Sequence, residues 1–434
     1  MLLIKNKKIE AILVKIVDSL FKPMQIGQLE FHLPDGSNKH FGNPAFGLNV
    51  DIKVNNYDFF KKLILYGDIG FAESYIDGDW TTSNLKNLID WLIINIENNP
   101  FLMEDKEKNK PISFLNFINQ LQNILNKNTL RGSKKNIASH YDLGNNFFSL
   151  FLDQSMTYSS AYFTDDTQEL FEAQQIKYDT LCKKIKLDSS DSILEIGSGW
   201  GGFSVYAAKH YGCKITTVTI SENQYNHTKT LITKEGLENI IDVKLCDYRM
   251  LNGKYDKVVS IEMIEAVGHD FLDLYLSKCQ SLLKKNGIFA LQAILCPDHR
   301  YNSFRRNIDF IQKHIFPGSI LPSFERIFNG LKKSGTLSLL DYEDISPSYA
   351  KTLSIWKHNF LNSKNEILKL GFDDKFIRKW EYYFSYCESA FNTRNISVAQ
   401  IIFSRPNNLT LNPGLSLLNK DKYLPEKNLL NKNH

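Results

Sequence analysis

The spacing of apolar residues changes several times along the chain, and each change predicts a different kind of element. A short apolar run at 193–196 is followed by a glycine-rich turn, a helical pattern over 203–210 and a second apolar run over 215–220. Apolar runs of this length, bounded by turn residues, are typical of buried strands, and with the helix between them they predict a βαβ unit. Similar runs predict further strands at 241–245, 257–261, 288–294 and 398–403. The alternation predicts an α/β fold with a doubly wound, mostly parallel sheet.

The N-terminal part of the chain follows other patterns. Helical spacing predicts an amphipathic helix over 2–21, and alternation broken by Gly and Pro predicts short strands over 25–57. Helical patterns return around the turn signals Gly67-Asp68 and Asp77-Gly78-Asp79. These elements predict a small α+β domain over residues 1–126, with a further helix expected at 112–125. We interpret the first helix as packed on this domain, with contact to a membrane surface through its lysines as the alternative.

The remaining segments complete the predicted organisation. Residues 127–139 form a basic linker, which is either a solvated hinge or a stretch attracted to anionic phospholipid headgroups. The second domain is predicted over 140–405, with helices at 342–360 and 372–392. Its aromatic insert at 298–330 is too long for a connecting loop and is expected to form a lid or side wall. Residues 406–434 are expected to form a flexible tail.

Composition narrows the class of protein. The chain has 434 residues, of which 43% are hydrophobic, enough for more than one domain. Its net charge of +4, without a long basic block, argues against nucleic acid as the main partner. Six scattered cysteines argue against a zinc cluster or a disulfide scaffold and suit a reducing compartment, so no metal is expected. No stretch approaches the roughly 18 apolar residues of a membrane span, and we do not interpret the N-terminus as a signal peptide.

Ligands of doubly wound sheets bind at the carboxyl ends of the strands, which directs attention to the glycine turn. This turn has the form E-x-G-x-G-x-G-G, from Glu195 to Gly202, and differs from the G-x-G-x-x-G of dinucleotide sites. The acidic residue expected near the end of the second strand would be Glu222, which falls in what looks like the start of a helix. The pattern therefore favours a nucleoside carrying a charged sulfonium over a pyrophosphate.

Further motifs identify a family. The region 140–405 resembles cyclopropane-fatty-acyl-phospholipid synthases and the related mycolic-acid methyltransferases through HYDLGNNFF, MTYSSAYF, LEIGSGWGGF, VTISENQ, DYR, EMIEAVG, FIQKHIFPGSILPS and AFNTRNISVAQIIFSR. GFAESYIDGDW extends the resemblance into the N-terminal region. The resemblance implies a Rossmann-like, seven-stranded methyltransferase domain that uses S-adenosylmethionine. It also implies a cytoplasmic enzyme, peripheral at the inner face of the membrane and possible as a homodimer, that adds a methylene group to the cis double bond of unsaturated phospholipid chains.

The resemblance also assigns the site residues. The expected cofactor contacts are Tyr158, Ser159, Glu195, Gly197, Gly199, Thr219, Ile220, Gln224, Asp247 and Tyr248. Methyl transfer to an alkene leaves a carbocation, which aromatic faces can stabilise, and a base must then remove a proton from the new methyl group. In the family this base is a bound bicarbonate ion, and the corresponding ligand positions here are Ser160, Glu265, Gln292 and Tyr349.

This set departs from the family pattern at two positions. Ser160 stands where a Cys is usual, and Gln292 stands where a His is usual. Both side chains can hydrogen-bond an anion, but the loss of a ligand that could be cationic weakens the case for bicarbonate. Glu262 lies one helical turn before Glu265, and two neighbouring carboxylates would raise one pKa, so either could act as the base directly. Cys387 matches a cysteine of the synthases, although we interpret it first as a packed helical residue.

Three alternatives to cyclopropane formation stay open from the sequence. A fatty-acyl C-methyltransferase would use the same cofactor and give methylene- or methyl-branched chains, because only the proton that leaves the cation differs. A small-molecule N-methyltransferase would share the catalytic domain, although the N-terminal domain and the aromatic insert argue against it. A lipid-binding protein without catalysis is the third alternative, and the intact cofactor turn argues against it.

Overall fold

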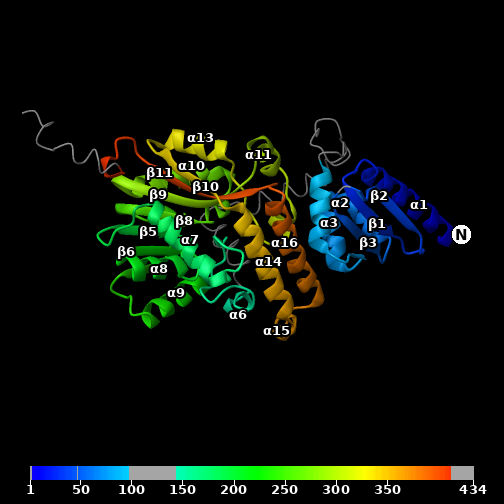
Figure 1. Cartoon of the computed structure of the whole chain (residues 1–434), viewed down its shortest axis with the longest axis horizontal. Helices are drawn as coiled ribbons and strands as arrows, with labels where there is room; N and C mark the ends of the chain where they lie inside the picture. The colour runs from blue at the N-terminus through cyan, green and yellow to red at the C-terminus, as the bar shows by residue number, and fades with distance from the viewer. Residues whose placement is uncertain (1, 46, 97–142, 412–434) are drawn as a thin grey trace, which may run out of the picture.

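The computed structural model describes residues 2–45, 47–96 and 143–411, which form two units joined by long helices (Figure 1). The helix expected at 112–125, the basic linker at 127–139 and the tail beyond residue 411 lie outside the described residues. Within the described ranges, none of the helices combines the length and the apolar character needed to cross a bilayer.

The N-terminal unit combines helices with a small sheet. Its four-stranded sheet has the order β2-β1-β3-β4, in which β1 pairs antiparallel with β2 and parallel with β3. The elements in chain order are α1 (Leu2–Phe21), β1 (Gly27–His32), β2 (Asn38–Asn43), β3 (Asn49–Val54), α2 (Asp58–Asp77), β4 (Trp80–Thr81) and α3 (Leu85–Asn95). Gly67 marks a kink inside α2, where its φ of 59° departs from the helical conformation, and Gly78 ends that helix in the left-handed region.

The C-terminal unit is a seven-stranded sheet of order β10-β11-β9-β8-β5-β6-β7, as the resemblance implies. The strands are β5 (Ser192–Ile196), β6 (Lys214–Thr219), β7 (Ile241–Leu245), β8 (Tyr255–Ile261), β9 (Leu283–Leu295), β10 (Ser338–Asp344) and β11 (Ser397–Ser404). Helices α7 (Leu170–Lys184), α8 (Gly202–Tyr211), α9 (Glu222–Lys234) and α10 (Leu272–Leu282) alternate with them. The run from β7 to β9 is parallel, and β11 and β10 extend it antiparallel.

Strand β10 corrects the sequence prediction, which begins a helix at residue 342. In the structure that residue belongs to the edge strand, and α14 (Ser346–Asn362) starts four residues later, with a proline in its first turn. Leu339, Leu340 and Tyr342 are all exposed, so β10 lacks the inward–outward alternation by which a strand is recognised. Two further helices follow α14, namely α15 (Lys364–Lys369) and α16 (Asp374–Asn392).

The aromatic insert folds into three short helices, α11 (Asp298–Phe304), α12 (Phe310–His314) and α13 (Phe324–Ser334). Helix α13 packs on α10 beside the large sheet, whereas α12 contacts α2 of the N-terminal unit. Glu73 of α2 forms this second contact, because its carboxylate pairs with Lys313 at 2.6 Å and with His314 at 2.9 Å. The insert is therefore a side wall that joins the two units.

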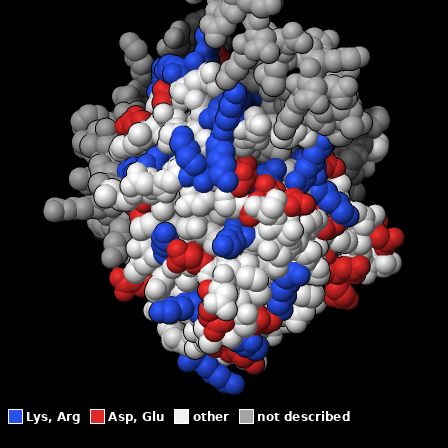
Figure 2. Space-filling model, turned by 90° about the vertical axis from the view of Figure 1, so that its left-hand side faces the viewer, with Lys and Arg blue, Asp and Glu red and all other residues white. Residues whose placement is uncertain are grey.

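Helices α14 and α16 lie between the large sheet and the N-terminal unit (Figure 1). Helix α16 packs on α14 on one side and on α2 and α3 on the other. Across this contact, the Tyr75 hydroxyl donates to Glu381 at 3.0 Å and Arg378 Nε donates to the carbonyl of Ile76 at 2.7 Å. Figure 2 shows basic and acidic side chains interspersed on the face at the opposite end, beside β6 and α9.

Candidate active site

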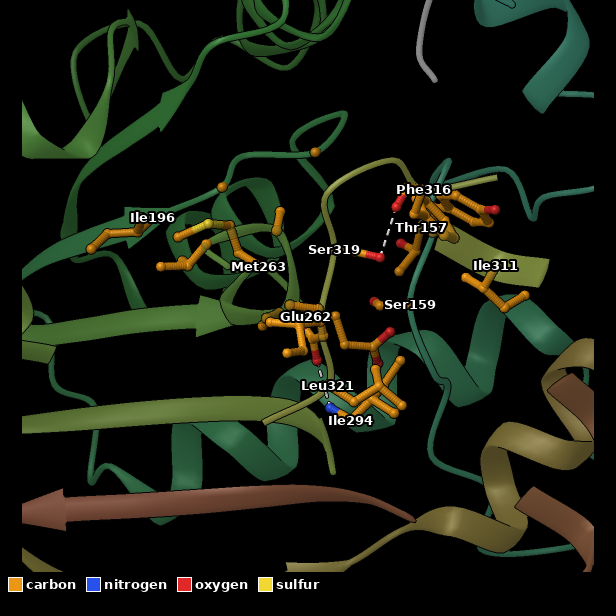
Figure 3. A pocket seen from close by; sticks show the side chains of 18 of the residues that line it. Thr157, Ser159, Ile196, Glu262, Met263, Ile294, Ile311, Phe316, Ser319 and Leu321 are labelled. Atoms are coloured by element: carbon orange, nitrogen blue, oxygen red, sulfur yellow. Dashed lines mark hydrogen bonds between the residues drawn. The ribbon is translucent and has the colours of Figure 1, made fainter. Parts of the chain in front are cut away.

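A cavity of about 320 Å³ opens at the carboxyl ends of the parallel strands. Its walls come from the segments that follow β5, β6, β7 and β8, from the insert, and from α14 and α16. Figure 3 shows this convergence, with Ile196 and Met263 on the strand side, Ile311 and Phe316 from the insert, and Glu262 between them. Among the residues that the structure describes, no group of His, Cys, Asp and Glu is arranged to hold a metal ion.

The glycine turn after β5 presents backbone to the cavity. The amide groups of Gly197 and Ser198 donate to the carbonyl of Val218 at 3.0 and 2.9 Å, which fixes the turn against β6. Gly199 has a φ of 50°, and a Cβ added there would have no atom within 4 Å. Since Gly199 also lines the cavity, that open space is where a bound group could approach the backbone.

Polar side chains after β6 and β7 line the same end of the cavity. Thr219 Oγ1 donates to Gln224 Oε1 at 2.8 Å, so the Gln224 amide keeps its N–H groups as its remaining donors. Ser221 caps α9 by accepting from the backbone of Gln224 at 3.4 Å. Asp247 is tied to Arg249, whose Nε and Nη2 donate to it at 2.8 and 2.6 Å. A nucleoside would meet fixed amide and carboxylate groups here.

Glu195 is anchored beneath the glycine turn. Its carboxylate accepts hydrogen bonds from the hydroxyls of Ser204 and Thr217, which belong to α8 and β6. Burial raises the pKa of Glu195 to about 7, and the two hydroxyls oppose that shift. The geometry makes Glu195 an anchor beneath the turn, although it still contributes to the cavity floor.

Glu262 follows β8 directly and borders the cavity between the strand side and the insert (Figure 3). Its Oε1 accepts from the backbone N–H of Ser160 at 2.9 Å and from Gln292 Nε2 at 2.8 Å. Its Oε2 accepts from the hydroxyl of Tyr349 at 2.8 Å. Burial raises the pKa of Glu262, while these three hydrogen bonds and the charge of Lys177 oppose the rise.

The expected helical relation between Glu262 and Glu265 is wrong. Glu262 has a φ of 49° and therefore lies outside any helix, and the 3₁₀ helix η4 (Ile264–Ala266) begins two residues later. Both carboxyl groups nevertheless line the cavity, since the left-handed residue turns the chain back toward it. The two acids are neighbours through a local backbone reversal, which apolar spacing does not reveal.

Glu265 is held much less firmly than Glu262. Its Oε1 accepts from the backbone N–H of Ile294 at 2.6 Å, and its buried Oε2 has no hydrogen-bond partner among the described residues. Burial, with the negative charge of Glu262, raises the pKa of Glu265 to about 8. Glu262 therefore has three hydrogen bonds that favour its charged form, whereas Glu265 has one.

Two of the expected bicarbonate ligands lie behind Glu262 instead of on the cavity wall. Ser160 and Gln292 are fully buried, and the Ser160 hydroxyl donates to the neighbouring carbonyl of Ala161 at 2.9 Å. Gln292 Oε1 accepts from Gln400 Nε2 of β11 at 3.2 Å. The other expected catalytic positions, Glu262, Glu265, Tyr349 and Cys387, line the cavity, as do all ten expected cofactor positions.

Lys177 is a buried cation beside the site that sequence reasoning missed. Its Nζ donates to the Ser159 hydroxyl at 2.8 Å and lies 4.4 Å from the centre of the Tyr178 ring. Burial lowers the pKa of Lys177 to about 7, and the charge of Glu262 opposes that shift. One signal could have revealed it, because Lys177 occupies the apolar phase of α7, where Ala173 and Leu181 are buried.

Aromatic side chains form the wall contributed by α14, α16 and the insert. The hydroxyls of Tyr158 and Tyr383 are 3.0 Å apart, and Tyr349 stacks on Phe391 with ring centres 4.4 Å apart. Cys387 lines this wall, and burial raises the pKa of its thiol, which keeps the group neutral. The site therefore joins a polar strand-end pocket to an apolar, electron-rich one.

Comparison with known proteins identifies relatives with lipid substrates. Residues 128–401 match the family described as mycolic acid cyclopropane synthetase. The chain is 35% identical over 348 residues to tuberculostearic acid methyltransferase UfaA1 of Mycobacterium tuberculosis, covering 78% of this chain and 79% of that protein. It is 34% identical over 361 residues to cyclopropane-fatty-acyl-phospholipid synthase of Escherichia coli, covering 82% of this chain and 88% of that protein.

Solved structures give the same picture. The mycolic acid cyclopropane synthase CmaA1 complexed with SAH and CTAB is 29% identical, with a TM-score of 0.59, over 63% of this chain and 98% of that one. Coclaurine N-methyltransferase has the same TM-score of 0.59 at 18% identity, which shows a shared fold alone.

Proposed function

This chain belongs to the mycolic acid cyclopropane synthetase family of S-adenosylmethionine-dependent methyltransferases, and from that membership we propose that it forms cyclopropane rings on unsaturated phospholipid acyl chains. The observation that carries the proposal is the joined cavity, in which the glycine turn, an aromatic wall and a buried carboxylate border one space. Lipid modification by a methyltransferase is the coarser activity shared by its relatives. The cis double bond and the ring product are the finer parts of the proposal.

The residues at the strand ends fit S-adenosylmethionine. The open side of Gly199 leaves room for a ligand against the backbone, and Gln224 offers amide donors beside it. Tyr158 and Ser159 would border the methionine part, and Asp247 and Tyr248 would border the adenine. When bound, S-adenosylmethionine supplies an electrophilic methyl group, and its transfer to an alkene leaves a carbocation on the acyl chain.

The chain's own residues do the rest. The apolar wall keeps water away from the cation, because added water would convert the cation to an alcohol. The faces of Tyr158, Tyr349 and Phe391 stabilise positive charge beside them. A carboxylate at the cavity edge accepts the proton released when the ring closes. An N-methyltransferase would have little use for this combination, and the likeness to such an enzyme extends to the fold alone.

A second candidate is a fatty-acyl C-methyltransferase that gives branched chains. Its support is the 36% identity over 273 residues to a probable fatty acid methyltransferase of Pseudomonas putida, together with the similarity to UfaA1. Both products pass through the same cation, so the position of the base relative to the new methyl group decides between them.

The decisive experiment uses S-adenosylmethionine with a labelled methyl group and vesicles of an unsaturated phosphatidylethanolamine. We expect label in the acyl chains, a mass gain of one methylene group, and resistance of the product to ozonolysis, because a ring has no double bond. Vesicles of the saturated lipid are the matched control and should stay unlabelled. An ozonolysis-sensitive product would support the branched-chain alternative, and unlabelled lipid despite cofactor binding would reject both.

Vesicles that also contain an anionic phospholipid test where the enzyme works. Ile12 and Ile16 are exposed on α1, one turn apart, and support the proposal that this helix touches the inner face of the membrane. We expect the protein to float with anionic vesicles and expect Ile12→Asp together with Ile16→Asp to reduce that binding. Unchanged flotation of this variant would assign membrane contact to another surface.

A further inference from the structure

We propose that Glu262 is itself the base of the reaction, because its carboxylate fills the anion pocket formed by Ser160, Gln292 and Tyr349, and that the enzyme works without bicarbonate. The inference rests on the proposed function, which requires a base beside the acyl chain. It changes the expectation from the family resemblance, in which the same three positions would hold a separate ion.

The hydrogen bonds of Glu262 give the first argument. Three donors from three separate elements converge on one carboxylate at 2.8 to 2.9 Å. A free anion needs such donors to displace its hydration, and here the chain's own anion takes them. Among the described residues, only the Tyr349 hydroxyl donates to Oε2, so this oxygen of a cavity-lining residue keeps a lone pair for a further proton.

The backbone of Glu262 gives the second argument. A φ of 49° is left-handed, a conformation that is strained for a residue with a Cβ and that glycine adopts freely. Strain of this kind persists where the surroundings hold the residue for a purpose. In Glu262 the side chain that this backbone carries reaches all three donors. We infer that these hydrogen bonds hold the strained conformation in place.

The third argument is that the pocket has only one consistent hydrogen-bond arrangement. Gln292 Oε1 accepts from Gln400, so the NH₂ group of Gln292 must face Glu262. An amide fixed in this way offers its N–H groups to an acceptor such as the Glu262 carboxylate. Gln400 is thus a positioning residue, and Gln292, Ser160 and Tyr349 hold the carboxylate in place.

Glu265 lacks these features. It has a single backbone donor, and its buried Oε2 has no hydrogen-bond partner among the described residues, so little holds its carboxylate in place. The proton transfer is therefore assigned to Glu262. A C–H bond of the transferred methyl group breaks, its electron pair closes the ring onto the cationic carbon, and the proton goes to Oε2 of Glu262. The resulting carboxylic acid returns its proton to water after the product leaves.

Two variants at the same position test this assignment. Glu262→Gly accepts the left-handed backbone without strain and empties the pocket, whereas Glu262→Gln fills it with an amide that is not a base. In buffer purged of carbon dioxide, we expect wild-type labelling of lipid to be unchanged. Both variants should lose activity by about 10²- to 10⁴-fold, the usual contribution of a general base. Added bicarbonate or formate should restore part of the activity of Glu262→Gly and none of that of Glu262→Gln.

Glu265→Ala serves as the control for rescue. The space left by this side chain offers an anion only one backbone donor, so added bicarbonate or formate should not raise the activity of this variant. Binding of ¹³C-bicarbonate, followed by NMR, gives a readout that needs no turnover. We expect binding to Glu262→Gly and none to wild type or Glu262→Gln. S-adenosylmethionine affinity, measured by calorimetry, should stay within a few-fold of wild type in all three proteins.

Different results overturn different claims. Unlabelled lipid with wild type would reject the proposed function, while the NMR comparison would still decide whether Glu262 fills the anion pocket. Labelled lipid whose yield collapses without bicarbonate, ¹³C-bicarbonate bound to wild type, or near-normal turnover of Glu262→Gln would each reject Glu262 as the base.

Discussion

Two parts of the cavity differ in how they are built: the cofactor end around the glycine turn and the base end around Glu262. At the cofactor end, the wall takes residues from three short stretches, 197–202, 219–224 and 247–248, at the carboxyl ends of β5, β6 and β7. At the base end, one carboxylate depends on donors from Ser160, Gln292 and Tyr349, which lie far apart in the sequence. The cofactor end therefore depends on backbone shape and empty space, and the base end depends on the chemistry of particular side chains. Substitutions at the two ends should fail in different ways.

Gly199→Val should give the largest effect at the cofactor end. Valine there would be strained at a φ of 50° and would fill the open space. We expect S-adenosylmethionine affinity to fall roughly 100-fold or more, equivalent to about 2.7 kcal/mol, in a calorimetric titration. Gly236→Val is the matched control, because Gly236 also has a positive φ and open space but lies outside the cavity wall. Equal losses of affinity in both variants would show that strain, and not the cavity, is responsible.

Tyr349→Phe should act on turnover and leave cofactor binding unchanged. Loss of one donor to the carboxylate should lower the rate roughly 10- to 100-fold, below the loss of a full oxyanion contact. The base must be ionised, so the rate falls as pH drops through the pKa of Glu262, which burial already raises. Removing a hydrogen bond to the charged form raises that pKa further, and the acid limb should move to higher pH.

The pH–rate profile of Tyr349→Phe should be compared with that of Tyr342→Phe, an exposed tyrosine of β10. An unmoved acid limb in Tyr349→Phe would mean that Tyr349 supports packing alone. A weaker affinity for S-adenosylmethionine would contradict the separation of the two ends.

Gln400→Leu should have the smallest effect, because Gln400 acts through Gln292. The leucine would leave Gln292 Oε1 without its donor, at a cost of about 1–3 kcal/mol in the free energy of unfolding. With its orientation no longer fixed, Gln292 should hold Glu262 less well, and we expect turnover to fall roughly 3- to 10-fold. The acid limb should again shift upward, and a loss of stability with an unchanged pH profile would assign Gln400 a packing role only.

The same contrast explains what could be predicted from the sequence. The strands and the glycine turn follow from local periodicity, since each strand of a βαβ unit is buried on both faces. Strand β10 has no such pattern, because Leu339 and Leu340 face solvent at a sheet edge. Apolar spacing predicts six strands, and only the resemblance implies the seventh.

The candidate site divides along the same line. The motifs predict Glu262 and Glu265 as neighbouring carboxylates and Tyr349 as a ligand beside Glu265, but the left-handed backbone at Glu262 has no signature in apolar spacing. Lys177 and Gln400 were missed because their importance depends on partners that only the folded sheet brings near. Strands and turns are thus predictable from residues that are neighbours in the sequence. This hydrogen-bond network depends on pairs of residues that are far apart in the sequence and meet only in the folded protein.

The left-handed backbone at position 262 also bears on how such enzymes diverge. Glycine occupies that conformation freely, and glutamate and glycine codons differ by a single base. One nucleotide change would therefore exchange a resident carboxylate for a vacant anion pocket, with no penalty to folding at that residue. With Glu262 as the resident base, this mutation would make the rate of lipid modification depend on the bicarbonate that forms from dissolved carbon dioxide. The reverse mutation would remove that dependence.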